Sequence, residues 1–409
     1  MAYGDASCDA ALREAWRTFC RRLEEAGERV FKDYNPPLPQ HRADGFRFLT
    51  QNLGQAFQLA LETRDPRYPE IHAFVTPYCK LGADCADFVY QQAWISGDAV
   101  YRVSGNRGTC RFLNFTVQGE RPDRIPGTDA PSLHEPFGDL PEANLFGHQL
   151  ETAWDGSFEL YIGGEPRGPN WLPTTPKSRK LFIRQGFDRW DEEPASLRIE
   201  RIDMAEPRPL PTPEALVEAM DWAGRFLLGM MDDWPDHPIR HSPAVDPTVV
   251  NAFPEAVADS AEDRKRGRAA ANLYWELAPD QALIVEFEAG RDFWMVTNMG
   301  PFMTSMDYLY RPVSYTPART AVDPDGRVRL VLAHRDPGVA NWLDTQGFVC
   351  GHLTFRSLLS GSVPRFATRT VPLGALFDAL PAETRRCTPE ERRAEMWRRF
   401  RAIRRRYRL

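Results

Sequence analysis

The spacing of hydrophobic residues predicts helices near the two ends of the chain and at its centre. Over residues 8–33 and 43–62, apolar side chains recur every three or four positions, which is typical of amphipathic helices. Residues 212–232 open on a Thr-Pro-Glu sequence, which indicates a helix start because Pro fits the first turn. A last helix is expected over residues 389–409.

The stretches between these helices have the alternating pattern of β-strands. Residues 88–118 divide into strands separated by glycine turns, and residues 158–202 hold further strands. The same pattern resumes over 272–298 and continues from 327 to 358. Several short strands joined by Gly- and Pro-containing turns indicate sandwiches or jelly rolls.

The strand pattern occurs twice. The sequence DGSFELYIGGEPRGPNWL (155–172) aligns with DGRVRLVLAHRDPGVANWL (325–343) when one residue is inserted. Upstream, residues 97–115 and 279–298 share the order of a strand, a Gly-Arg turn and an aromatic-rich strand. A repeat of this length indicates duplication of one supersecondary unit. The Asn-Trp-Leu sequence that ends each copy is then expected to be an equivalent structural corner.

The expected fold class is mainly β with flanking helices (α+β), built as two related β-sandwich-like or jelly-roll-like units. The 409 residues are enough for two domains with appendages. The expected division is an N-terminal helical segment (1–76), a first β-sandwich-like unit (77–211), a helical connection (212–268), a second unit (269–380) and a C-terminal Arg-rich amphipathic helix (381–409).

Composition and charge limit which cellular locations and which classes of partner are expected. The net charge of -6 gives no electrostatic reason to expect nucleic-acid binding. No apolar run approaches the roughly 20 residues of a membrane span, and no secretory signal opens the chain. No membrane partner is therefore expected, and the cytoplasm is the expected location. The cysteines contain no CxxC and the histidines no HExxH, so neither a metal nor another cofactor is expected.

The last helix is strongly basic. It holds nine Arg, whereas Met396, Phe400, Ile403 and Tyr407 step by four, three and four and share one face. The favoured interpretation is a helix docked by its apolar face with its basic side in solvent. An anion-binding or RNA-binding tail is the alternative.

The first candidate for chemistry is the polar loop that begins at Lys80 and leads into an apolar strand. Asp84 and Asp87 suit a turn, because Asp carboxylates accept hydrogen bonds from nearby backbone amides. The alternative is that the loop delivers functional groups to the mouth of a cavity. Asp84 would then bind substrate and the phenol of Tyr90 would be catalytic.

The second candidate is the segment that ends the second copy of the repeat. The first copy has Gly and Pro near the positions of His334 and Asp344, so the scaffold is shared and the charged groups are not. A single functional site in a duplicated framework has this pattern. Because His titrates near neutrality and a carboxylate can fix its tautomer, His334, Asp336 and Asp344 are catalytic candidates. Arg335 and Trp342 are substrate-binding candidates, although Arg335 and Asp336 can also pair locally.

Further substrate-binding candidates lie on neighbouring strands. His352 and Arg356 are four positions apart and share one face of a strand under strict alternation. Aromatic and polar walls are expected from Trp275, Trp294, Asn298 and Tyr308. Packing in the core or at a sheet edge is the alternative for these four residues.

Three stretches resemble the bacterial domain-of-unknown-function family 1214 over about residues 43–375. They are KLGADCADFVYQQAWISGDAVYRVSGNRGTCRFLNFTV, then WDGSFELYI with NWLP and LFIRQGF, and AHRDPGVANWLDTQGFVCGHLTFR. The resemblance implies an all-β, jelly-roll-like protein with duplicated units that is often oligomeric, so a homo-oligomer is expected. It implies no activity, because none is established for the family. In such proteins the early loop often has Asn and Pro after its first Asp, where this chain has Cys85-Ala86.

Two functions remain open. The first is a cofactor-independent lyase or hydrolase acting on an aromatic or other apolar small organic molecule by general acid/base chemistry. In it, His334 would transfer the proton and Tyr90 or Arg356 would bind an oxygen. The second is a non-catalytic carbohydrate- or metabolite-binding tandem β-sandwich protein, in which exposed Trp rings stack on sugars. A metal held by His334 and His352 is a weaker alternative, because ligand-spaced histidines are missing.

Overall fold

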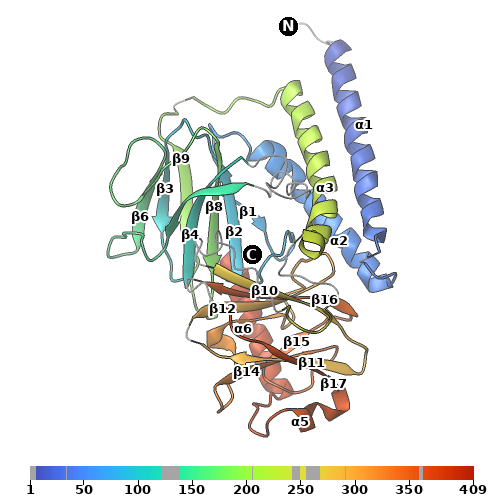
Figure 1. Cartoon of the computed structure of the whole chain (residues 1–409). Helices are drawn as coiled ribbons and strands as arrows, with labels where there is room; N and C mark the ends of the chain where they lie inside the picture. Colours follow the sequence, from blue (N-terminus) through green and yellow to red (C-terminus); the bar gives the residue numbers. More distant parts are fainter. Residues whose placement is uncertain are drawn as a thin grey trace.

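The chain folds into two β-sandwich units of similar size, with long helices along one side of the first unit (Figure 1). The second unit lies below the first in this view, and the chain ends between them. The structure is a computed structural model, and it describes residues 6–33, 35–120, 139–204, 206–241, 249–254, 268–290, 292–358 and 363–409.

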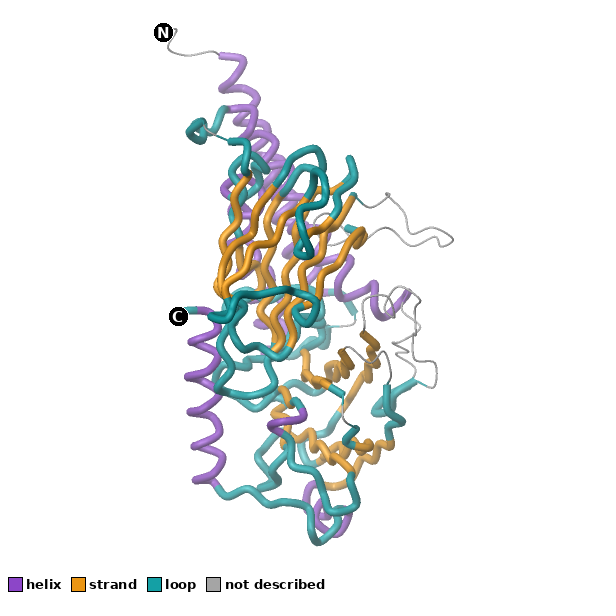
Figure 2. Tube along the Cα trace, turned by 90° about the vertical axis from the view of Figure 1, so that its left-hand side faces the viewer, coloured by secondary structure: helices purple, strands orange, loops and turns teal. Residues whose placement is uncertain are grey.

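The helices are α1 (Ala6–Glu28), α2 (Pro39–Phe57), α3 (Pro213–His241), α5 (Leu376–Ala379) and α6 (Pro389–Tyr407). Helices α1, α2 and α3 pack beside the first unit, whereas α5 and α6 pack against the second unit (Figure 1 and Figure 2). A π-turn over Gln58–Glu62 continues α2, so this helical stretch begins slightly before the predicted 43–62, at a Pro in its first turn. Buried apolar residues of α1, α2 and α3 form one cluster with part of the first unit, and Trp94 belongs to it.

The first unit consists of two facing sheets. One has the strand order β1-β2-β8-β4-β5 and the other β7-β6-β3-β9. The strands are β1 (His72–Val75), β2 (Phe88–Trp94), β3 (Tyr101–Asn106), β4 (Phe112–Gly119), β5 (Leu140–Phe146), β6 (Ser157–Ile162), β7 (Trp171–Leu172), β8 (Ser178–Gly186) and β9 (Ser196–Arg201). Strand β1 corrects the expectation of a purely helical segment before residue 77, since it pairs with β2.

The second unit repeats this plan. Its sheets have the orders β10-β16-β12-β13 and β15-β14-β11-β17, which are the orders of the first unit with eight added to each strand number and without β1. The strands are β10 (Arg268–Glu276), β11 (Gln281–Glu288), β12 (Phe293–Met299), β13 (Ser314–Tyr315), β14 (Arg327–Ala333), β15 (Trp342–Asp344), β16 (Cys350–Leu358) and β17 (Ala367–Pro372). The predicted pair of related β-sandwich units is confirmed.

Alternation along the strands separates a core face from a second face that turns toward the helices and the other unit. In β4, Leu113, Phe115 and Val117 enter the core of the first sandwich, whereas Asn114 and Thr116 lie on the opposite face. In β16, Leu353 and Phe355 enter the core of the second sandwich. In the sheets that contain β4 and β16, the opposite face carries buried polar groups; Asn114 is satisfied within its own sheet by Thr116 and Arg184.

The two Asn-Trp-Leu corners are equivalent in structure. The side chain of Asn170 bonds to the backbone N–H and C=O of Glu151 and to the C=O of Glu159 at 2.7 to 3.0 Å. Asn341 makes the same three bonds, to both backbone groups of Ala321 and to the C=O of Arg329. Each following Trp donates its indole N–H to a backbone C=O at the end of the preceding strand. The signature is therefore structural.

The C-terminal helix α6 docks as expected, but the face that it buries differs from the prediction. It runs beside the second unit and reaches the joint between the units (Figure 2). Arg392, Arg399 and Arg406, spaced by seven residues, are buried on this face together with Ala402 and Ile403. The apolar pattern predicted the side of α6 that docks. Three arginines are buried on the same side because they pair with carboxylates and backbone carbonyls of other segments.

We expect Asn341→Ala and Asn170→Ala to destabilise the fold by about 3 kcal/mol each, because each leaves three buried backbone groups without partners. Chemical denaturation followed by tryptophan fluorescence measures this loss. Similar losses in the two variants support equivalent corners. A loss below about 1 kcal/mol in both variants contradicts this role.

Candidate functional site

His334 and Asp336 each bond to separate partners, and the segment around them does not form the predicted catalytic group. Nε2 of His334 lies 3.2 Å from the C=O of Leu277, and Nδ1 lies 2.6 Å from Oγ1 of Thr345. Asp336 instead pairs with Arg392 at 3.0 Å and accepts the N–H of Gly338. Within the described residues, no carboxylate contacts the imidazole.

The other charged groups of this segment also have separate positions. Asp344 is buried and pairs with Arg311 at 2.8 Å, while Arg335 is exposed. Strand β15 places Asp344 beside the strand that ends at Ala333, but its carboxylate accepts the N–H of Gln346 and turns away from His334. The proposed acid/base group of three residues is therefore not assembled, because each member is satisfied by its own partner.

The tryptophans expected as pocket walls lie in the core. Trp275 and Trp294 are buried in the second sandwich, and the indole of Trp275 donates to Oδ1 of Asn298 at 2.9 Å. Asn298 in turn donates to the C=O of Asp344. Trp342 is buried in a smaller cluster near α5. The alternative interpretation of core packing holds for these residues.

His352 is a buried histidine of β16 on the face opposite to Leu353. Its Nδ1 has no hydrogen-bond partner within the described residues, and its ring lies 5.4 Å from that of Tyr274. Burial lowers the pKa of His352 to about 4. His352 and Arg356 share a face of β16, as alternation predicts, but no contact links His352 to the groups described next.

The structure brings four of the predicted residues together at the joint between the units. Asp84 interacts electrostatically with Arg356, Tyr90 and Tyr308. Tyr90 also interacts with Arg356 and with Tyr308. The loop that precedes β2 supplies Asp84, and the loop that follows β12 supplies Tyr308. Hydroxyl and guanidinium groups from both sandwiches thus surround one buried carboxylate.

Asp84 connects the two units. Its carboxylate accepts the backbone N–H of Ser305 at 2.7 Å and the hydroxyl of the same residue at 2.5 Å. Arg356 donates to the C=O of Ala83 next to it, and the N–H of Cys85 donates to the phenol of Tyr90. Burial raises the pKa of Asp84, and Lys80 lowers it by less. Asp84 can therefore hold a proton more readily than an exposed carboxylate.

Lys80 was not singled out from the sequence, yet its amine lies at the centre of the joint. Its Nζ donates to the C=O groups of Ser305 and Met306 at 2.5 Å and lies 4.7 Å from the ring centre of Tyr308. Lys80 is 5% exposed, and burial lowers its pKa to about 8, although Asp84 and Asp307 raise it. A large fraction of this amine is therefore neutral slightly above physiological pH.

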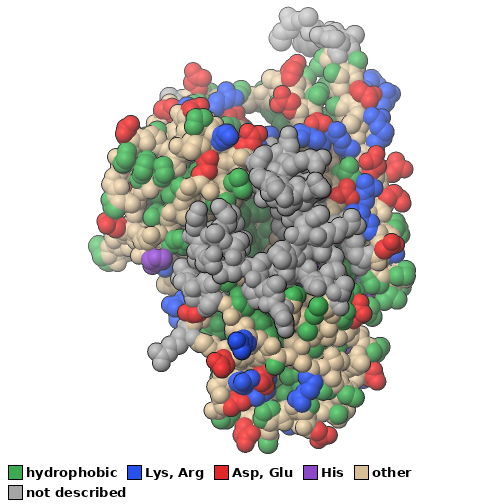
Figure 3. All heavy atoms as spheres, viewed as in Figure 1, with side chains coloured by type: hydrophobic (Ala, Val, Ile, Leu, Met, Phe, Trp, Pro, Cys, Tyr) green, Lys and Arg blue, Asp and Glu red, His purple; other side chains and the backbone are tan. Residues whose placement is uncertain are grey.

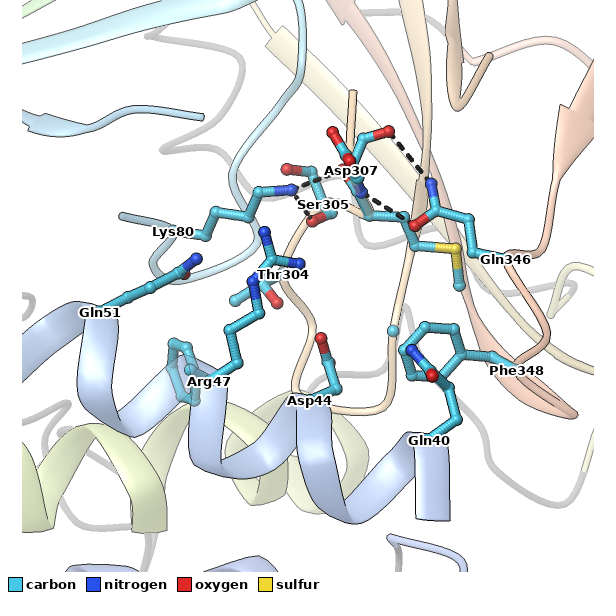
Figure 4. A pocket seen from close by; sticks show the side chains of 13 residues that line it. Gln40, Asp44, Arg47, Gln51, Lys80, Thr304, Ser305, Asp307, Gln346 and Phe348 are labelled. Carbon is cyan, nitrogen blue, oxygen red and sulfur yellow. Dashed lines mark hydrogen bonds between the residues drawn. The ribbon is translucent and has the colours of Figure 1, made fainter. Parts of the chain in front are cut away.

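A small pocket opens beside this amine (Figure 4). Helix α2 contributes Asp44 and Arg47, whose side chains point toward Lys80, and Gln346 closes the far side by bonding to the backbone of Asp307. The free volume is about 30 Å³, room for about one water molecule. Burial raises the pKa of Asp44, and Lys80 lowers it by less. The pocket thus combines an amine with the carboxyl group of Asp44, which can hold a proton.

The backbone around the pocket is held in an uncommon conformation. Ala83, Met303 and Gln346 have φ between 49° and 56°, the left-handed region that non-glycine residues rarely occupy. The N–H of Ala83 donates to the C=O of Met303, so two of these residues fasten each other across the joint. Such conformations cost of order 1–3 kcal/mol each and concentrate at functional sites.

One signal in the sequence would have drawn attention to Lys80. Only five of the 51 basic residues are Lys, and Lys80 stands directly before the Asp84 loop. Because Lys can lose its proton when buried and Arg does so far less readily, a lysine retained in an Arg-rich chain is informative. Asp44 carried no such signal, since only the packing of α2 brings it to the pocket.

The described residues contain no group of three or more His, Cys, Asp or Glu side chains arranged to hold a metal ion. Among the described helices, none is long and apolar enough to cross a membrane. On the face shown in Figure 3, acidic and basic side chains are interspersed along the helical edge of the described part.

We expect acid to destabilise the protein between pH 6.5 and about 4, partly through His352. Its pKa is lower in the folded chain than the usual 6.5, so the unfolded chain binds more protons in this window and stability falls as pH falls. The loss from this residue is about 3 kcal/mol at most. Denaturation midpoints of His352→Phe should change less with pH than those of the parent, and identical pH profiles would contradict the assignment.

Comparison with known proteins finds relatives among solved structures. Neither a protein-family model nor a curated protein matches it, so the resemblance to family 1214 stays a prediction. The VPA0106 protein from Vibrio parahaemolyticus gives a TM-score of 0.44 at 12% identity, over 85% of this chain and 100% of that protein. An uncharacterized protein from Burkholderia cenocepacia gives a TM-score of 0.80 at 32% identity, over 90% of this chain and 99% of that one. The chain therefore belongs to the same family as this uncharacterized protein from Burkholderia cenocepacia.

Proposed function

We propose that the protein is a cofactor-independent enzyme of the lyase or hydrolase type, in which Lys80 is the reactive group. The observation that carries this proposal is the buried amine of Lys80 at the wall of a pocket that also contains Asp44. A structural lysine of this kind would be expected to pair directly with a carboxylate. Lys80 instead donates to two backbone carbonyls, and it has no ion pair with a carboxylate among the described residues.

The lyase reaction suits this arrangement best. A neutral amine attacks a carbonyl carbon, and the carbonyl oxygen leaves as water to give a protonated imine. This iminium accepts the electron pair of the neighbouring carbon–carbon bond as that bond breaks, which leaves an enamine. Protonation and hydrolysis of the enamine then release the product and the free amine. A desolvated lysine has the lowered pKa that this attack requires. The carboxyl groups of Asp44 and Asp84, whose pKa values are raised by burial, are suited to supply and recover the protons.

The pocket lining favours a small polar substrate over the aromatic or apolar one expected from composition. The lining residues from α2 include Gln40, Asp44, Arg47 and Gln51, and Phe48 and Phe348 are its aromatic residues (Figure 4). The guanidinium of Arg47 can pair with a carboxylate. We infer that the substrate is a small carbonyl compound, such as an oxo acid, whose carbonyl end would enter the water-sized space beside Lys80 while the rest would occupy the open side of the pocket.

The alternative of carbohydrate binding has less support. The tryptophans expected as walls of a ligand pocket, Trp275, Trp294 and Trp342, are all buried. The exposed Trp154 and Trp397 lie on separate elements, before β6 and on α6. Stacking on a sugar face needs an exposed ring face, and the three buried rings pack against core side chains instead.

Reductive trapping tests the proposed reaction. We expect cyanoborohydride to fix pyruvate, glyoxylate or acetaldehyde covalently on Lys80, detected as a mass increase of the matching peptide. Lys80→Arg should abolish this adduct because the guanidinium does not form an imine. Lys177→Arg, which replaces an exposed lysine, is the matched control and should leave the adduct unchanged. Absence of an adduct on Lys80 with every carbonyl compound, or equal labelling of Lys177, would sink the proposal.

The pH dependence of trapping gives a second test. Because the neutral amine attacks and burial lowers the pKa of Lys80 to about 8, the initial labelling rate should rise with pH and reach half its maximum near pH 8. Labelling of Lys177 gives the comparison for an exposed amine. A half-maximum near pH 10.5 for Lys80 would contradict the role of burial.

A further inference from the structure

A second cluster of buried charges lies on the other side of the Asp84 loop, where α6 crosses the joint. Asp87 of this loop is fully buried, and Nη2 of Arg319 lies 2.6 Å from its Oδ2. Nη1 of Arg406 lies 3.5 Å from its other oxygen. Burial alone would raise the pKa of Asp87, but Arg319, Arg406 and Arg399 together lower it, so the carboxylate is ionised.

The arginines of this cluster gather around one indole ring. The guanidinium carbons of Arg319, Arg399 and Arg406 lie 4.1, 5.0 and 5.5 Å from the ring centre of Trp190. Three guanidinium groups thus share a single aromatic ring and a single carboxylate. Cation–π attraction and backbone carbonyls offset part of the cost of burying these charges.

The positive charge of the cluster exceeds the negative charge that faces it. Three arginines face only Asp87 as a directly paired carboxylate, and Glu395, which lies nearby, pairs with Arg392 at 2.7 Å. Buried N–H groups of Arg319 (Nη1), Arg399 (Nε) and Arg406 (Nε) have no hydrogen-bond partner within the described residues. Unpaired buried donors of this kind are costly, and a bound anion would reduce the cost.

A cavity of about 370 Å³ opens directly beside this cluster. Arg319 and Trp190 belong to both the cluster and the cavity wall, and Arg386 and Arg398 line the remaining wall. In all, four arginines and two glutamates line the cavity. Both glutamates already have partners, since Glu391 caps α6 through Thr388 and Glu395 pairs with Arg392. Arg385 lies 3.7 Å from Glu391 and Arg319 pairs with Asp87, so Arg386 and Arg398 are the lining guanidinium groups that have no paired carboxylate among the described residues.

We propose that this cavity binds a small anion that carries two or more negative charges on oxygen atoms, a dicarboxylate or a phosphate compound. Arg319 would hold one anionic group at the inner end, and Arg386 and Arg398 would hold the other nearer to solvent. Guanidinium forks suit both carboxylate and phosphate oxygens. The site is separate from the Lys80 pocket and does not depend on the proposed reaction.

The position of the site gives its ligand a structural effect. The cavity is built from Trp190 of the first unit, Arg319 of the second unit and Arg398 of α6. A ligand that contacts all three parts binds the assembled joint and not the separated units. Binding should therefore stabilise the folded chain, as any ligand specific to the folded state does.

Thermal unfolding and calorimetry with defined anions test this proposal. At constant ionic strength, succinate or inorganic phosphate should raise the unfolding temperature in a saturable manner, whereas acetate and chloride should not. Succinate acting alone identifies a dicarboxylate site, and phosphate acting alone identifies a phosphate site. Absence of a saturable shift with both anions, or an equal shift with acetate, would overturn the proposal.

Variants locate the binding. Arg398→Gln and Arg386→Gln should each weaken the effective anion about tenfold or more in Kd. Arg401→Gln is the matched control, because Arg401 is an exposed arginine on the same helix outside the cavity, and it should bind as the parent does. Equal Kd values in the parent and both cavity variants would refute the site. Lys80→Arg should retain anion binding, so failure of the Lys80 proposal and failure of this one are distinguishable.

Discussion

The burial of two carboxylates on one loop is the constraint on which the arrangement of the two units depends. Asp84 is 2% exposed and Asp87 is fully buried, and neither finds adequate partners within its own sandwich. Ser305 of the second unit satisfies Asp84, while Arg319 of the second unit and Arg406 of α6 satisfy Asp87. Since an unpaired buried charge costs several kcal/mol, the units cannot separate without exposing or neutralising both groups.

This constraint also explains where polar chemistry collects in the molecule. Each sandwich uses one face of its strands for its apolar core and leaves polar side chains on the opposite face, as Asn114 and His352 show. In the sheets that contain β4 and β16, this face is covered by the helices and by the contact between the two units. The joint is therefore the place where amines, carboxylates and guanidinium groups are held away from water with perturbed pKa values.

The residues that differ between the two copies of the repeat have structural roles and do not form the predicted acid/base group. The sequence predicted a functional site at the charged residues that only the second copy has, His334 to Asp336 and Asp344. In the structure they fasten a corner, since His334 bonds to Leu277 and Thr345, and Asp336 holds Arg392 of α6. The difference between the copies reflects what each corner must contact. Within the described residues, no helix is bonded to the first corner as α6 is to the second.

The sequence by itself determined the elements and their duplication, because alternation, helical spacing and turn residues are local properties that survive in any context. It predicted two related sandwiches, the equivalent Asn-Trp-Leu corners, the docked C-terminal helix and the importance of the Asp84 loop. Only the tertiary structure decided which charged groups meet. Asp84 and Ser305 are 221 residues apart, Asp87 and Arg406 are 319 apart, and Asp44 reaches the Lys80 pocket only because α2 packs there. Whether a histidine is free or bonded, or a lysine charged or neutral, depends on such distant neighbours and on burial, and neither is encoded in local spacing.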